Sequence, residues 1–364
     1  MDVPSDAIVF WGVVAARVLV PLAVFRFPLP AMLASLVIDG LDQTIFQTFT
    51  SINLEDYQSY DKALDVYYLS MAYLSMLRNW VSRDAFDIGR FLFYFRLVGT
   101  VLFEQTQIRA LLLLFPNTFE YFFDTYEAIR TRWDPRRLAR NLLIGIAAFI
   151  WIVFKLPQEW FIHVAELDAT EIIGGAPWIG VVAIIGAVVV AVLVWRFVVP
   201  RLDPADHPFT LDADRHQPMV DGNAIDRERR SIVQNVVALE LLEKIVLIGL
   251  VSIIFSRMLP GADPTAIDIL IGVGVLVVAN AILSSVLIRR GDRPHGVVQS
   301  FVVILALNAA IVLLAQFVLQ TLRGISLQHA LVFVLLLSLI LAAYDRYRPL
   351  YKARFANGPL AAPR

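Results

Sequence analysis

The chain has 364 residues, of which 58% are hydrophobic and 17% charged, and its mean hydropathy is +0.68. A water-soluble domain needs a more charged surface, so the composition excludes one and predicts an all-α fold, a polytopic transmembrane helical bundle. The net charge of −1 provides no general basic surface, so we expect a lipid bilayer and no nucleic acid as partner. Because cysteine is absent, thiolate metal sites and cysteine nucleophiles are excluded.

Apolar windows of about 19 residues predict about 10–11 membrane-spanning helices. In chain order they lie at residues 7–25, 30–50, 61–79, 87–104, 108–129, 141–157, 175–199, 232–257, 266–288, 297–320 and 326–344. The fifth segment is ambiguous because Pro116 interrupts it. Its second half carries Glu120, Asp124 and Glu127 at helical spacing on one side. If that half lies along the membrane interface, ten crossings remain and the orientation of all the preceding segments in the membrane is reversed.

The character of the chain changes along its length. Residues 1–170 form a membrane bundle rich in ionisable residues, which is the candidate functional core, and 171–200 hold a transmembrane helix. A charged, proline-rich loop at 201–231 separates it from an apolar carboxy-terminal bundle at 232–346 and a tail at 347–364.

Basic loops predict the orientation. Arginine-rich stretches at 78–83, 130–140, 227–230, 288–294 and 345–354 are typical of cytoplasmic loops, whereas the alternate loops hold few cations. The carboxyl terminus and the loop and tail at 201–231 and 347–364 are therefore expected in the cytoplasm, and with eleven spans the amino terminus lies outside. The high arginine and alanine content favours a bacterium, and hence its plasma membrane.

Four aspartates form the most informative pattern in the sequence. Asp39 and Asp42 are three residues apart near the end of the second segment, and Asp61 and Asp65 are four apart at the start of the third. Each pair shares a helix face, and two antiparallel helices bring the four carboxylates to one level. Such a group needs divalent cations, protons or basic partners, and its hard oxygen ligands suit Mg²⁺ or Mn²⁺.

The pattern resembles the CDP-alcohol phosphatidyltransferase family, whose motif is Asp-x-x-Asp-Gly-x-x-Ala-Arg followed by Gly-x-x-x-Asp-x-x-x-Asp. This chain reads DGLDQTIFQ from Asp39 to Gln47 and YQSYDKALD from Tyr57 to Asp65. The resemblance implies that Asp39, Asp42 and Asp61 are ligands of one or two divalent ions, and that Asp65 is the base that deprotonates an acceptor alcohol. It also implies transfer of a phosphatidyl or related group from a CDP-linked donor. The chain departs from the motif at Gln43, Phe46, Gln47 and Tyr57, where the family has Gly, Ala, Arg and Gly.

Other charged residues lie within the apolar segments. Arg96 is a candidate catalytic residue that binds a lipid phosphate, or alternatively an ion-pair partner of Asp65, Asp87 or Glu104. The acids at 120, 124 and 127 form either a proton or cation path or a solvated interfacial face. Glu240 and Lys244, four apart, are expected to neutralise each other.

Three hypotheses follow from these features. The first is a divalent-metal-dependent transferase acting on a lipid-linked or CDP-linked substrate, with an extracytoplasmic variant that uses a polyprenyl-phosphate sugar. The second is a proton- or cation-coupled transporter, and the third is a non-catalytic membrane scaffold. The sequence contains no motif for ATP binding or for a nucleophile elbow.

Overall fold

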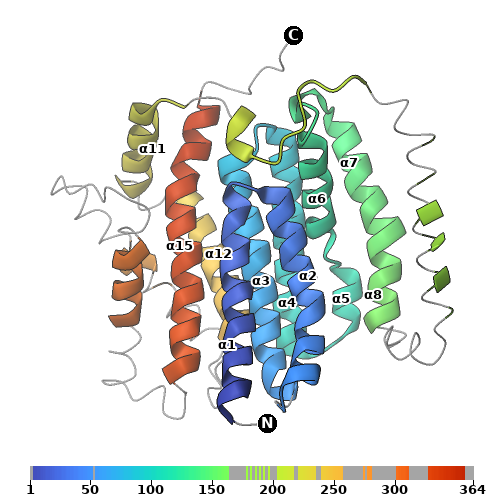
Figure 1. Ribbon diagram of the computed structural model, residues 1–364. Helices are drawn as coiled ribbons and strands as arrows, with labels where there is room; N and C mark the ends of the chain where they lie inside the picture. Colours follow the sequence, from blue (N-terminus) through green and yellow to red (C-terminus); the bar gives the residue numbers. More distant parts are fainter. Residues whose placement is uncertain are drawn as a thin grey trace.

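The computed structural model describes residues 3–51, 54–163, 203–216, 220–234, 239–256, 277–280, 301–310 and 327–356, with a few single positions between 178 and 196 and at 274. The described chain is helical and contains no strand, as the sequence predicted. Its helices stand side by side as one bundle, with the amino terminus at the lower end and α15 finishing at the upper end (Figure 1). The predicted segments at 175–199, 266–288 and 297–320 fall largely outside the described residues.

The amino-terminal part contains most of the described helices. They are α1 (Val3–Leu19), η1 (Val20–Phe25), α2 (Pro28–Phe49), α3 (Leu54–Asn79), α4 (Arg83–Thr106), α5 (Ala110–Leu114), α6 (Thr118–Arg130), η2 (Pro135–Arg137), α7 (Arg140–Phe149), the π-helix η3 (Ile150–Lys155) and α8 (Leu156–His163). Further along the chain come η6 (Ala213–His216), α11 (Gly222–Gln234), α12 (Leu239–Phe255) and α15 (Leu327–Phe355).

Proline and capping residues explain several of these boundaries. Pro21 has no backbone N–H to donate, and there α1 gives way to the 3-10 turn η1. Pro28 occupies the first turn of α2, where a missing N–H costs nothing. Ser82 caps α4, because its Oγ accepts from the backbone N–H of Ala85 at 3.3 Å. Gln107 ends α4 in the left-handed conformation, with φ of 56°.

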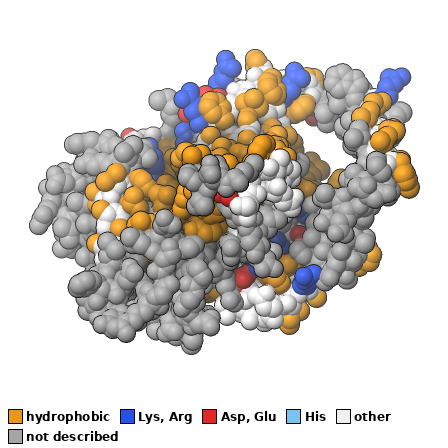
Figure 2. Space-filling model, turned by 60° about the horizontal axis from the view of Figure 1, so that its bottom comes forward, with side chains coloured by type: hydrophobic (Ala, Val, Ile, Leu, Met, Phe, Trp, Pro, Cys, Tyr) orange, Lys and Arg blue, Asp and Glu red, His pale blue; other side chains and the backbone are white. Residues whose placement is uncertain are grey.

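Four helical stretches are long and apolar enough to cross a membrane, which supports the predicted membrane bundle. Among the described residues they are Asp6–Phe25, Pro28–Phe49, Arg140–Phe161 and Ala330–Phe355. Their surfaces carry exposed large hydrophobic side chains, and hydrophobic side chains occupy much of the described surface in Figure 2. Lipid is the medium that suits such a surface.

The α3 helix is the centre of the bundle. From Ala63 to Trp80, every side chain is buried except Asp65 and Arg78. Helices α1, α2, α4, α12 and α15 all contact α3. A helix enclosed by other helices needs no apolar outer surface, which explains how α3 can carry many tyrosines and charges.

Several predicted boundaries are wrong in detail. The fifth segment is not one helix, because it breaks between α5 and α6 at Pro116. The last segment continues as helix to Phe355, so the predicted tail begins inside α15. The charged loop at 201–231 contains η6 and the start of α11, and its residues 206–213 are hydrogen-bonded to the bundle.

Among the described residues, the basic stretches after α3, after α6 and at the end of α15 meet at the upper end of the bundle. Arg354 donates to the backbone oxygen of Trp80 at 2.7 Å, and the backbone N–H of Asp206 donates to the oxygen of Arg132 at 3.0 Å. The first bond joins the tail to the end of α3 and the second joins the loop after α6 to the 203–216 segment, while the Arg78–Asp214 ion pair joins the two groups. We call this the basic-loop end.

Candidate functional site

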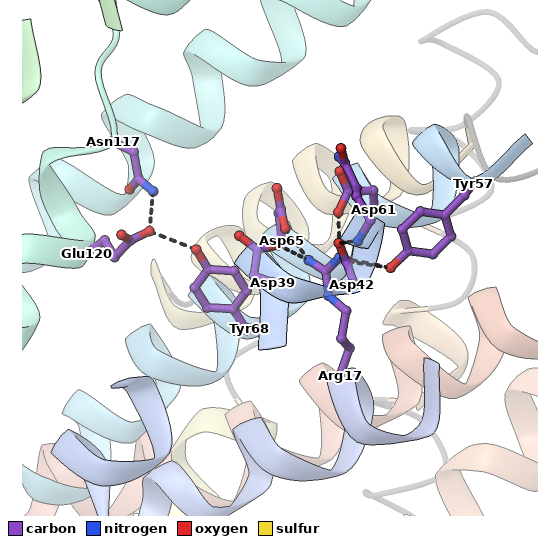
Figure 3. A network of polar contacts seen from close by, with 10 residues as sticks. Arg17, Asp39, Asp42, Tyr57, Asp61, Asp65, Tyr68, Asn117 and Glu120 are labelled. Carbon is purple, nitrogen blue, oxygen red and sulfur yellow. Dashed lines mark hydrogen bonds and ion pairs between the residues drawn. The ribbon is translucent and has the colours of Figure 1, made fainter. Parts of the chain in front are cut away.

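Four aspartates from α2 and α3 converge on one arginine, and we call this group the acid centre (Figure 3). Arg17 on α1 donates to one carboxylate oxygen of each of Asp39, Asp42, Asp61 and Asp65. The prediction that the four carboxylates share one level is thus confirmed. The position is not as predicted, because Asp39 and Asp42 lie in the middle of α2 instead of near its end.

The sequence analysis missed Arg17. Its side chain is 3% exposed, and its two terminal nitrogens are shared among four carboxylates. The sequence did carry a signal, because the acid group required cations, protons or basic partners, and Arg17 is the lone basic residue of the first apolar segment. Four ionised carboxylates around one guanidinium still leave three negative charges unbalanced.

The four carboxylates have different surroundings. Asp42 is fully buried and accepts from the Tyr57 hydroxyl at 2.6 Å and from the Gln43 backbone N–H at 2.5 Å. The side chains of the other three are partly exposed, at 29% for Asp39, 22% for Asp61 and 40% for Asp65. Asp42 therefore serves to anchor Arg17, whereas the other three present oxygen atoms outward.

The outward-facing carboxylates have the spacing of a metal site. One ligand oxygen from each of Asp39, Asp61 and Asp65 lies within 4.8 Å of the others. Three carboxylates are a donor set for a hard divalent ion such as Mg²⁺ or Mn²⁺. This trio differs from the predicted ligands, because Asp65 joins it and Asp42 is turned toward Arg17 and Tyr57.

Two residues at which the chain departs from the family motif are packed against each other. The rings of Phe46 and Tyr57 are 4.4 Å apart between centroids, and both side chains are buried. Where the family has small residues, this chain has an aromatic pair. Tyr57 also bonds to Asp42 and accepts from Arg17 at 3.0 Å, so the pair supports the acid centre.

A second polar group lies where α5 and α6 break. Glu120 accepts from the Tyr68 hydroxyl and from Asn117 Nδ2, both at 2.7 Å. The Asn117 backbone N–H donates to Glu159 at 3.2 Å, and Lys155 Nζ lies 3.9 Å from the ring centroid of Tyr121. Tyr68 lies three residues beyond Asp65 on α3 and links this group to the acid centre (Figure 3).

Arg96 belongs to this second group. It donates to the backbone oxygen of Phe115 at 3.0 Å and lies 3.9 Å from Glu159. The predicted pairing of Arg96 with Asp65, Asp87 or Glu104 is wrong, since these acids pair with Arg17, Arg90 and Lys62 respectively. Helical periodicity places a residue on a face but does not identify which helix lies opposite.

Two further charge predictions are corrected. The acids of α6 do not form a solvated face, because Glu120 is 5% and Glu127 1% exposed within the bundle. Glu240 and Lys244 do not pair with each other. Lys244 bonds to Asp345 at 2.7 Å and Glu240 to Lys352 at 2.9 Å, so both attach α12 to α15.

A cavity of about 620 Å³ opens at the basic-loop end, away from the acid centre. Its lining comes from the start of α2, the ends of α3 and α6, the loop after α6 and residues 206–213. Its charged side chains are paired in the structure: Arg130 with Glu127, Arg136 with Asp134, and Arg137 with Asp206. The volume is in the range of small-molecule pockets.

Comparison with known proteins gives no assignment. No family model matches the chain, and no curated protein or solved structure matches it.

Proposed function

We propose that the protein is a divalent-metal-dependent membrane transferase whose acid centre binds phosphate-bearing, lipid-linked substrate. One observation carries the proposal: Asp39, Asp61 and Asp65 place three carboxylate oxygens within 4.8 Å of one another, inside a bundle of apolar helices. A divalent ion held there would neutralise phosphate charge and leave coordination positions open. Mg²⁺ and Mn²⁺ are the ions that suit this donor set.

The residues present fit such an ion. Arg17 donates to one oxygen of each aspartate of the trio, and the second oxygen of each is not bonded to Arg17. The excess negative charge around Arg17 favours a cation at the same place. Asp65 has the most exposed side chain of the four, at 40%.

The aromatic pair argues for a particular donor. Phe46 and Tyr57 fill space beside Asp42 that small residues leave open in the family motif. We therefore favour a lipid-linked phosphate, such as a polyprenyl-phosphate sugar, over a CDP-linked donor.

Metal binding is tested first. Mn²⁺ binding to the purified protein in lipid nanodiscs, measured by electron paramagnetic resonance, is expected to weaken about tenfold or more in Asp61→Asn. Asp87→Asn, whose carboxylate is exposed and pairs with Arg90, is the matched control and is expected to bind as the wild type does. Equal binding by wild type and Asp61→Asn would refute the metal site.

Turnover is tested second. Purified protein with Mn²⁺ and an acceptor alcohol such as glycerol is supplied with CDP-diacylglycerol in one arm and a polyprenyl-phosphate sugar in another, and release of CMP or polyprenyl phosphate is measured. Release in the second arm supports the favoured donor, and release in the first supports the CDP-linked one. Metal binding without release from either donor would refute both donors proposed here.

A second candidate function is proton- or cation-coupled transport. The break between α5 and α6 favours it, because interrupted helices with charged residues at the break are typical of transporter binding sites. Uptake of ⁵⁴Mn²⁺ into proteoliposomes that is lost in Asp61→Asn would support transport over transfer.

We further propose an eleven-span topology with a cytoplasmic carboxyl terminus. The meeting of the basic loops at one end supports it, since α4 leaves that end and α6 returns to it. Single cysteines at Arg132 and at Thr106, both exposed, report the two sides in this cysteine-free chain. We expect an impermeant maleimide to label only the Thr106 position in intact cells, and the reverse pattern would contradict the topology.

A further inference from the structure

Three carboxyl groups follow one another along one side of α6. Glu120, Asp124 and Glu127 are separated by four and three residues, so consecutive groups have Cβ atoms about 5–6 Å apart. Over these seven residues the helix rises by about 10 Å. The row starts at the second polar group and ends at the basic-loop end.

The lower end of the row faces the acid centre. Glu120 accepts from Tyr68, and Tyr68 is an electrostatic neighbour of both Asp39 and Asp65. Figure 3 shows Tyr68 lying between Glu120 and the acid centre. Lys155 and Arg96 also act electrostatically on Glu120, so this end is charge-balanced.

The upper end of the row reaches the cavity. Glu127 is one of the residues that line the space of about 620 Å³. It accepts from Trp80 Nε1 at 2.8 Å and from Arg130 Nε at 2.7 Å. A cavity of this size with polar walls holds water, which can exchange protons with a carboxyl group.

The middle member, Asp124, lacks a basic partner within the described part of the chain. Oδ1 of Asp124 is enclosed and has no hydrogen-bond partner among the described residues. The groups that act on Asp124 electrostatically are Glu120 and Glu127, both acidic. A carboxylate between two others and without a cation is unfavourable in a poorly solvated place, whereas a protonated carboxyl is tolerated.

We propose that the α6 row, Glu120, Asp124 and Glu127, carries protons between the acid centre and the cavity at the basic-loop end. A proton from cavity water enters at Glu127, passes to Asp124 and then to Glu120. In each step one O–H bond breaks and one forms: hydronium in the cavity becomes water as Glu127 becomes a carboxylic acid, and in the later steps the donor acid becomes a carboxylate as the acceptor carboxylate becomes an acid. The direction reverses when a proton is released at the acid centre. The role of this proton route in the protein depends on the proposed function, but the existence of the route does not.

The proton on Asp124 is tested by covalent labelling. Dicyclohexylcarbodiimide adds to protonated carboxylic acids in apolar surroundings and gives a stable N-acylurea that mass spectrometry locates. We expect labelling at Asp124 and none at Asp87, which is exposed and paired with Arg90. Absence of labelling at Asp124 would overturn the proposal.

The route itself is tested by the rate at which Glu120 is protonated after a pH jump. The infrared carboxyl band of Glu120 is assigned from its loss in Glu120→Gln. In the isosteric variant Asp124→Asn we expect this rate to fall about tenfold or more with the amplitude retained, because the shuttling group is gone. Thr125→Val, which removes a hydroxyl on the same helix and leaves the acids intact, is expected to keep the wild-type rate.

An unchanged rate in Asp124→Asn would overturn the route. The experiment contains neither divalent cation nor lipid substrate, so its outcome is independent of whether the transferase proposal succeeds.

Discussion

Removal of the Arg17 guanidinium is the sharpest test of how the acid centre is held together. Arg17→Met keeps an unbranched apolar stem and deletes the charged guanidinium. The cost is set by Asp42, because both partners of that ion pair are buried, at 3% and 0% side-chain exposure. Leaving one buried charge without its partner costs about 3–5 kcal/mol. Water partly solvates the charges of the more exposed aspartates, so these carboxylates add less to the loss of folding free energy.

The assay is the free energy of unfolding in mixed detergent micelles, followed by circular dichroism during titration with sodium dodecyl sulfate. A loss of about 3–5 kcal/mol lowers the folding equilibrium constant by about 10² to 10⁴. Arg26→Met is the control, because Arg26 is 64% exposed and pairs with Asp212 at 3.4 Å, an arrangement worth about 0–1 kcal/mol.

The double variant Arg17→Met with Asp42→Asn gives a second measurement if the single variant fails to fold. Removing the stranded charge should restore about half of the lost stability or more. If Arg17→Met were no less stable than Arg26→Met, or if the double variant restored nothing, the ion pair would not be what stabilises the centre.

Three further predictions concern the rest of the bundle. Arg354→Leu removes charge-assisted hydrogen bonds to two backbone oxygens at the end of α3 and should lower the free energy of unfolding by about 2–4 kcal/mol, against little change for the exposed Arg346→Leu, both by the same titration. Gly99→Ala would place a Cβ in a steric clash with the side chain of Phe115 at the α5–α6 break and should destabilise by about 1–3 kcal/mol, whereas Gly145→Ala meets nothing within 4 Å and should be neutral or stabilising. Burial raises the pKa of Asp134, but hydrogen bonds from the neighbouring arginine outweigh it and leave the pKa below its usual value of 3.8. A carboxylate with a lowered pKa stabilises the fold above the unfolded value, so the stability difference between wild type and Asp134→Asn should be full at neutral pH and shrink as the pH falls below about 4; a constant difference would contradict this.

Sequence patterns predicted the positions of the helices well, but they predicted poorly which helices contact one another. The apolar windows located the helices that begin at Pro28 and Arg140, because hydropathy reports what lies against lipid. The grouping of the four aspartates followed from spacing alone, since i,i+3 and i,i+4 positions share a face. Pairs formed between distant helices were not predictable: Arg96 with Glu159 and Lys244 with Asp345 depend on which helices pack together.

The surroundings of the helix break within residues 108–129 were likewise not predictable from the sequence. Pro116 indicated an interruption, and the sequence left open whether the segment spans the membrane or its second half lies along the interface. In the structure, contacts from other helices hold the break inside the bundle, because Arg96 donates to the backbone oxygen of Phe115 and Glu159 accepts from the backbone N–H of Asn117. Both contacts come from residues that sequence reasoning had no means of placing opposite Pro116.

The four aspartates match a known motif in spacing, but the spacing alone does not determine which chemistry they perform. Two facing pairs of carboxylates on antiparallel helices form a cation site, and the cation that fills it need not be a metal alone. In this chain Arg17 supplies the first positive charge, and Tyr57 holds Asp42 toward it. Because the guanidinium balances one of four negative charges, the centre still requires protons or another cation. Asp39, Asp61 and Asp65 are the partly exposed carboxylates of the centre, so the proposed function assigns the remaining charge to a cation bound between these three.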